Sequence, residues 1–167
     1  IKETAQPPDT RHYGWVIVGA LMLIQTVGSG LGFYNMAVYI NRLSAELAVP
    51  VSDISFAVSL FFVIGGVAGL YVAALLARFN ARTIMIAGAL LAGTALGLVG
   101  WATKVWQVYV LFSLFGVGNA GISLVVATML VTQWFPGAER SMALALTSTG
   151  LSLGGVVLTP LSAYWLN

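Results

Sequence analysis

Five long apolar runs dominate this sequence, and no charged residue or histidine interrupts any of them. A helix needs about 20 apolar residues to cross the hydrocarbon core of a bilayer, so each run is long enough to span it. The runs do not alternate apolar and polar residues, as the strands of a membrane β-barrel would. The pattern therefore predicts an all-α membrane protein with about five transmembrane helices, at residues 15–40, 54–76, 83–101, 106–133 and 142–166.

The scarcity of charge supports the same conclusion. Charged residues make up 7% of the chain, whereas a soluble domain carries roughly 25%, so they could not cover a water-facing surface. The net charge of +2 is too small to indicate a nucleic-acid partner. The chain has no cysteine, and its one histidine, His12, precedes the first run. Since the runs hold no constellation of acid, base, nucleophile or metal ligand, the sequence predicts no enzyme activity, no metal site and no cofactor.

The basic residues are distributed unequally over the two sides of the expected bundle. Its connections are expected at residues 41–53, 77–82, 102–105 and 136–141. Lysine and arginine accumulate on the cytoplasmic side of membrane proteins. One side holds Lys2, Arg11, Arg78, Arg82 and Arg140, and the other holds Arg42 and Lys104. We therefore expect a protein of the bacterial inner membrane, with residues 1–13 as a cytoplasmic amino-terminal tail and residues 14–167 forming the helices.

Glycines recur at two matching intervals along the chain. Gly30 in the first run matches Gly118 in the fourth, 88 positions later, and Gly65 in the second run matches Gly154 in the fifth, 89 positions later. These matches predict a repeated three-helix unit, which occurs in membrane transport proteins. Small residues spaced four apart predict close helix packing. Such pairs are Gly28/Gly32, Gly65/Gly69, Gly93/Gly97 and Gly150/Gly154.

The connection after the second run resembles a family signature. Its sequence at residues 75–82, LLARFNAR, resembles the G-x-x-x-D-R-x-G-x-R signature between helices 2 and 3 of the major facilitator superfamily. Arg78 and Arg82 match the basic positions of that signature. Ala77 replaces its aspartate, which in the family helps to latch the cytoplasmic side. Asn80 replaces a glycine and still tolerates a left-handed turn.

Two further motifs narrow the resemblance. YGWVI at residues 13–17 opens the first run, and WFP at residues 134–136 closes the fourth, followed by Glu139 and Arg140. Together they resemble the monocarboxylate-porter and oxalate/formate-antiporter branch of the superfamily. The resemblance implies a twelve-helix fold, alternating access and small organic anions as substrates. Residues 14–167 would then be helices 1–5 of an incomplete amino-terminal half, with helix 6 and the second half beyond them.

Polar residues inside the runs are the candidates for a substrate cavity, because a polar group that faces lipid is costly. In the fold that the resemblance implies, helices 1, 2, 4 and 5 line the cavity and helix 3 lies outside. Serine and threonine often bond back to a carbonyl of the preceding turn, so Tyr34 and Asn119 rank first. The candidate substrate-binding residues are Tyr34, Asn119, Gln25, Ser123 and Ser148.

The expected partners are a small, anionic organic solute, the lipid bilayer and the rest of the same transporter chain. The runs contain no lysine or arginine, so a cationic partner for a buried carboxylate must come from the second half. Two alternatives stay open. One is a carrier of the same superfamily for a drug, sugar or nucleoside. The other is a non-transporting membrane sensor or assembly subunit.

Overall fold

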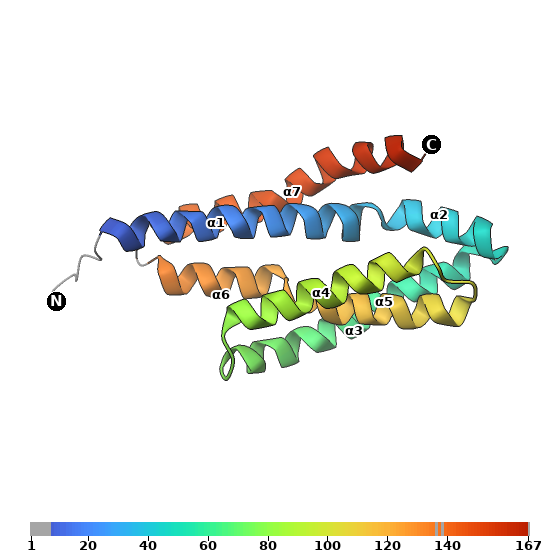
Figure 1. Ribbon diagram of the computed structural model, residues 1–167, viewed down its shortest axis with the longest axis horizontal. Coiled ribbons are helices and arrows are strands. Elements are labelled where there is room, and N and C mark those ends of the chain that lie inside the picture. The colour runs from blue at the N-terminus through green and yellow to red at the C-terminus, as the bar shows by residue number, and fades with distance from the viewer. Residues whose placement is uncertain (1–7, 136, 138, 167) are drawn as a thin grey trace.

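The structure is a computed structural model that describes residues 8–135, 137 and 139–166. The described chain forms a bundle of helices, which confirms the predicted all-α class (Figure 1). Five stretches are long and apolar enough to cross a membrane. The elements are α1 (Pro8–Gly28), the π-helical segment η1 (Ser29–Tyr34), α2 (Met36–Leu47), α3 (Val51–Leu76), α4 (Ala81–Val99), α5 (Val105–Gly121), α6 (Leu124–Trp134) and α7 (Glu139–Leu166).

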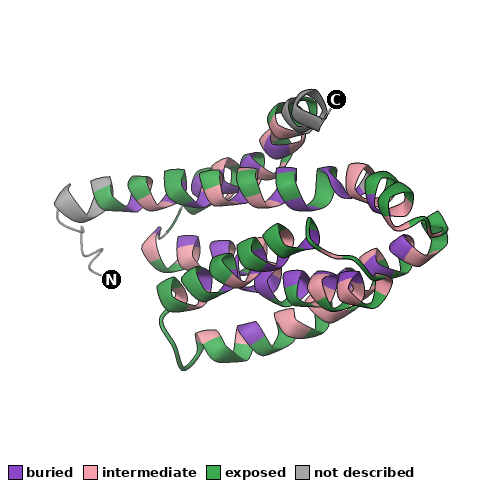
Figure 2. Cartoon of the chain, turned by 45° about the vertical axis from the view of Figure 1, so that its right-hand side comes forward, coloured by how far each residue is buried: buried purple, intermediate pink, exposed green. Residues whose placement is uncertain are grey.

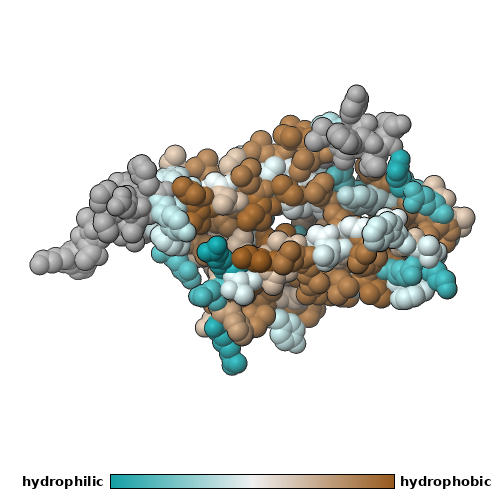
Figure 3. Space-filling view, viewed as in Figure 1, coloured by the Kyte–Doolittle hydropathy of each residue, from teal (hydrophilic) through white to brown (hydrophobic). Residues whose placement is uncertain are grey.

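The surface of the bundle has the polarity of a membrane protein. Figure 3 shows apolar side chains over the middle of the molecule and polar side chains gathered toward its two ends. Large apolar residues such as Leu23, Leu70 and Leu90 are exposed. Figure 2 shows that the buried residues lie where the helices face one another. Exposed leucines on a helix of this length match a lipid environment, in which they carry no penalty.

One expected boundary is wrong. Residues 41–53 were expected to be a connection, but α2 continues to Leu47. The helix ends at Ala48, which adopts a left-handed conformation with φ 52°, and α3 begins directly after Pro50. The polar residues within 41–47 indicate where the chain leaves lipid, but the helix continues through them. Helix α1 begins at Pro8, within the residues expected to be the cytoplasmic tail, and proline is well tolerated in a first helical turn.

The fifth helical stretch and the turn before α4 also differ in detail from expectation. Glu139 begins α7 three residues before the expected start, and an acidic side chain in a first turn is favourable for the helix dipole. Pro136, in the connection before it, lies outside the described residues. Asn80 precedes α4 with φ −62° and ψ 130°. The turn therefore needs no left-handed residue at the position where the family signature has glycine.

Helix α5 is held between α3 and α4 by glycines on two of its faces. A Cβ atom built on Gly116 would lie 2.6 Å from the carbonyl oxygen of Phe61 in α3. A Cβ atom built on Gly118 would lie 2.5 Å from the backbone nitrogen of Ala92 in α4. Backbones this close leave no room for a side chain. The predicted packing role is confirmed for Gly65 of α3, where a Cβ atom would lie 3.2 Å from the carbonyl oxygen of Gly116 in α5.

A second close pairing joins α1 and η1 to α7, which lie side by side in Figure 1. A Cβ atom on Gly30 would lie 2.8 Å from the carbonyl oxygen of Gly154. Spans 4 and 2 are paired as well, but there Gly65 meets Gly116, whereas Gly118, the match of Gly30 in the repeat, faces α4. The packing role expected for Gly93 and Gly97 is wrong within the described part of the chain, because no atom lies within 4 Å of a Cβ at either.

Candidate functional site

The fourth predicted span is broken near its middle. Residues 106–133 were expected to form one helix, but α5 ends at Gly121 and α6 begins at Leu124. Between them Ile122 has φ −109° and ψ 10°, and Ser123 is extended with φ −64° and ψ 163°. A break frees backbone groups that have no water to bond to at membrane depth. Such backbone occurs in membrane proteins where it is buried in protein or lines a cavity.

The side chain of Gln25 meets this break. Gln25 lies in α1 and is 5% exposed. With its amide turned so that the nitrogen faces Ile122, the nitrogen donates to the Ile122 carbonyl oxygen at 3.3 Å. The amide oxygen then accepts from the backbone N–H of Leu124 at 3.1 Å. Gln25 was a candidate substrate-binding residue, and the structure places its amide on the backbone of the fourth span.

A groove of about 480 Å³ lies beside the break. Its walls come from α3, the end of α5, the start of α6 and Phe33 of η1. Asn119 and Ser123 are the polar side chains that line it. Neither forms a hydrogen bond with any part of the chain that the structure describes. Gly66 and Gly69 face open space on the α3 wall, so the groove stays wide there. The groove therefore offers an amide and a hydroxyl to a bound molecule.

Asn119 also borders a smaller cavity. This cavity, of about 200 Å³, lies between α1, η1 and α4 on the other side of α5, and apolar residues and glycines make up the rest of its lining. Asn119 is half-buried between the two spaces. It stands four positions before Ser123, a spacing that would place the two residues on one face of an uninterrupted helix. They line one groove although the helix is interrupted between them.

The two other candidates lie apart from this groove. The ring of Tyr34 rests on α7, where a Cβ atom built on Gly155 would lie 2.8 Å from it, and Tyr34 lines neither cavity that Asn119 borders. Its side chain is 49% exposed. The hydroxyl of Ser148 donates to the carbonyl oxygen of Ala145 in its own helix at 2.9 Å. Ser148 thus follows the common behaviour of serine in membrane helices.

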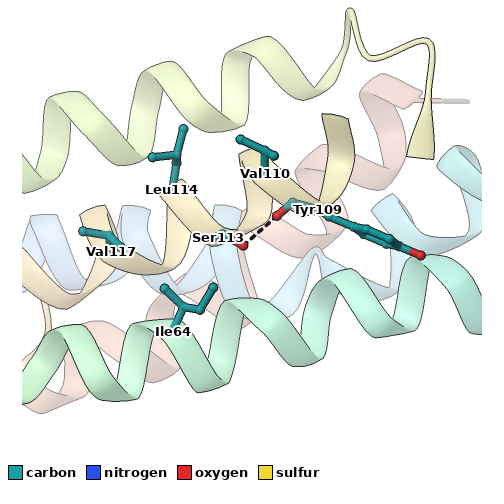
Figure 4. Close-up of a pocket in the computed structure, with 6 residues that line it drawn as sticks. All are labelled: Ile64, Tyr109, Val110, Ser113, Leu114 and Val117. Atoms are coloured by element: carbon teal, nitrogen blue, oxygen red, sulfur yellow. Dashed lines mark hydrogen bonds between the residues drawn. The ribbon is translucent and has the colours of Figure 1, made fainter. Parts of the chain in front are cut away.

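A separate furrow between α3 and α5 is lined mostly by apolar side chains and is unsuitable for a polar solute (Figure 4). It measures about 270 Å³ and is lined by Ile64 and by five residues of α5. Its serine, Ser113, donates to the carbonyl oxygen of Tyr109 at 2.7 Å. That bond occupies the hydroxyl proton within the helix. The furrow therefore presents an apolar surface that suits lipid chains better than a polar solute.

The basic turn between α3 and α4 lies at one end of the bundle. Arg78 and Arg82 are both exposed. A groove of about 360 Å³ at this turn is lined by Ala77 and Asn80 and reaches Gln133 at the end of α6.

The described residues contain no group of three acidic, histidine or cysteine side chains that could hold a metal ion.

Comparison with known proteins agrees with this architecture. The profile of the Major Facilitator Superfamily matches residues 21–167. The uncharacterized transporter ESBP6 of Saccharomyces cerevisiae is 30% identical over 93% of this chain and 24% of its own length. Monocarboxylate transporter 3 of Rattus norvegicus is 30% identical over 63% of this chain and 21% of its own length. The "Probable sulfoacetate transporter SauU" of Cupriavidus necator is 26% identical over 90% of this chain and 34% of its own length.

The relatives are much longer than the matched region. The chain spans between 21% and 34% of the three relatives named above. No solved structure matches the chain significantly.

Proposed function

This chain belongs to the major facilitator superfamily, and on that premise we propose that it forms helices 1–5 in the amino-terminal half of a transporter of small organic anions. It is an integral membrane protein that takes part in transmembrane transport. Transport by alternating access requires a second half that rocks against the first around a central site. We propose that the groove beside the break supplies the amino-terminal half of that site.

One observation carries the assignment of the groove. Asn119 and Ser123 both line it, and both lack a hydrogen-bond partner among the described residues. Many hydroxyl side chains in the spans bond back to their own helix, as Thr94 does to the carbonyl oxygen of Leu90 at 2.8 Å. A polar group without a partner at membrane depth is costly unless water or a ligand meets it. A polar solute bound in the groove would supply hydrogen-bond partners to both groups.

The anionic class of the solute rests on the named relatives. Two of them carry names that refer to monocarboxylates and to sulfoacetate, which are organic anions. A third relative, 27% identical over 71% of this chain, is named as the hexuronate transporter of Bacillus subtilis. Asn119 and Ser123 can donate hydrogen bonds to carboxylate or sulfonate oxygens. The cation that neutralises the anion would come from the second half, because the five apolar runs contain no lysine or arginine.

Uptake measurements on the complete transporter test the proposal. Asn119→Ala and Ser123→Ala should each raise the KM for the solute about fivefold, which corresponds to the loss of one hydrogen bond worth about 1 kcal/mol. Thr94→Ala is the matched control, since its hydroxyl is exposed on α4 and bonded to its own helix. Normal KM values for both groove variants would show that the groove is not the site.

Tyr34 remains a separate candidate with its own test. Its hydroxyl forms no hydrogen bond with the described residues, and its ring is held against Gly155 at the junction of η1 and α7. Tyr34→Phe keeps the ring and removes the hydroxyl alone. If the hydroxyl binds solute, affinity should fall by about 1 kcal/mol while expression stays the same. Unchanged affinity would remove Tyr34 from the site.

A further inference from the structure

The break in the fourth span lies opposite one polar side chain of the first. The amide of Gln25 donates to the carbonyl oxygen of Ile122 and accepts from the N–H of Leu124, at 3.3 Å and 3.1 Å. We infer that Gln25 is a positioning residue, which holds the break between α5 and α6 and thereby sets how Asn119 and Ser123 face the groove. The consequence for transport rests on the proposed function of the groove, whereas the effect on the break does not.

The chemistry of the break explains why an amide is needed there. In an uninterrupted helix the N–H of Leu124 would donate to the carbonyl oxygen of Ala120, four residues earlier. The extended conformation of Ser123 takes this donor out of the ladder and turns the Ile122 carbonyl away from it. A primary amide carries a donor and an acceptor side by side. One Gln25 side chain therefore satisfies both groups on either side of Ser123.

The surroundings of Gln25 are built to keep it in place. Gly150 of α7 lies against α1 at this level, and a Cβ atom built on Gly150 would approach the Cβ of Gln25 at 3.2 Å. The same Cβ would collide with the carbonyl oxygen of Met22. The close approach of α7 thus fixes the depth at which α1 presents the amide. Through Gln25 the α1–α7 pair is bonded to the fourth span.

Both ends of the amide are occupied, which separates this role from solute binding. A glutamine that contacts solute needs a free donor or acceptor aimed at the cavity. Gln25 is 5% exposed, and it is absent from the lining of the groove that Asn119 and Ser123 share. A substitution at this position should therefore act on the break first and reach the solute through it.

Hydrogen exchange at single-amide resolution in the bilayer-reconstituted chain tests the inference. In the wild type the N–H of Leu124 should be protected. Gln25→Met keeps the length of the side chain and removes both hydrogen bonds, so exchange at Leu124 should accelerate at least tenfold. Thr26→Val is the matched control on the next position, because the Thr26 hydroxyl donates to the Met22 carbonyl oxygen in its own helix at 2.8 Å. This control should leave Leu124 protected.

Gln25→Glu provides a readout that simple packing would not give. A protonated carboxyl group can donate to the Ile122 carbonyl and accept from the Leu124 N–H, whereas an ionised one can only accept. The described neighbours Met22, Ile122, Leu124 and Gly150 are uncharged, so the introduced carboxyl is the group that titrates at this position. Both forms of the carboxyl group accept from the Leu124 N–H. Exchange at Leu124, taken relative to wild type at each pH, should therefore match wild type at acid pH and stay slower than in Gln25→Met at alkaline pH.

The outcomes decide between the inference and the proposed function. Unprotected Leu124 in the wild type, equal exchange in all variants, or loss of Leu124 protection in Gln25→Glu would overturn the role of Gln25. If Gln25→Met does not fold, the wild-type protection and the Gln25→Glu profile still decide. Faster exchange in Gln25→Met together with normal KM values for Asn119→Ala and Ser123→Ala would support the role of Gln25 at the break and refute the solute site. A raised KM for Asn119→Ala with unchanged exchange in Gln25→Met would do the reverse.

Discussion

Replacing Gly118 with alanine should separate two helices that now touch through their backbones. The added Cβ atom would lie 2.5 Å from the nitrogen of Ala92, 2.8 Å from the carbonyl oxygen of Gly88 and 2.9 Å from the Cα of Ala92. Ordinary contacts between such atoms lie near 3.5 Å, so α4 and α5 must part by about 1 Å. Overpacking of this kind costs about 1–3 kcal/mol, and the higher helix propensity of alanine offsets up to ~1 kcal/mol of it.

The same substitution at Gly93 is the control, because it changes the same chemistry in α4 where no atom lies within 4 Å of the new Cβ. Gly93→Ala should be neutral or stabilise the chain by up to ~1 kcal/mol through helix propensity. Gly118→Ala should destabilise it by about 1–2 kcal/mol. Reversible unfolding in mixed detergent micelles, followed by circular dichroism, measures both values. Equal free energies of unfolding for the two variants would refute the close packing of α4 on α5.

Three further predictions follow from the same geometry. Because the chain has no cysteine, single cysteines placed beside Arg42 or Lys104 should react with a membrane-impermeant reagent from outside, whereas one beside Arg78 should react from inside; the opposite pattern would reverse the topology. Ser29→Ala removes a 2.9 Å hydrogen bond to a carbonyl of α7 and should lower the free energy of unfolding by about 1 kcal/mol, more than Thr26→Ala, whose hydroxyl bonds within α1. The chain alone, reconstituted in liposomes, should show no saturable solute uptake, because it supplies less than one of the two halves that alternating access requires.

The spans could be predicted from the sequence because lipid imposes a simple rule on length and polarity. Five uncharged apolar runs of this length favour lipid over water, and in lipid their backbone groups must be paired within helices. The described part of the structure contains five such stretches. The ends of the helices were predicted less accurately from the sequence, since α2 continues through polar residues up to Leu47. Hydropathy reports where a chain leaves lipid. It does not report where the backbone stops being helical.

The candidate groove was visible in the sequence only in part. Asn119 and Ser123 were found because both are polar residues inside a long apolar run. The break between them was missed, because no proline or charge marks it and its two backbone groups are met by Gln25, almost a hundred positions earlier. Hydropathy carries no information about such a distant pairing. The same limit applies to η1, whose wide turn is closed by a bond from the Asn35 amide to the Gly30 carbonyl oxygen at 2.9 Å.

If the proposed function holds, the energetics of the groove determine what the second half of the site must contribute. An unpaired carboxylate moved out of water loses several kcal/mol of solvation even after the protein relaxes. Asn119 and Ser123 together can return about 1–3 kcal/mol through hydrogen bonds. The hydrogen bonds of the groove could therefore orient an anion, but they would not offset the free energy of removing it from water. A cation from the opposing half would close that gap, and it would do so only when the two halves come together around the solute. In the proposed transporter, binding and closure of the two halves would then be coupled by charge, and the neutral groove would select the shape and hydrogen-bonding pattern of the solute.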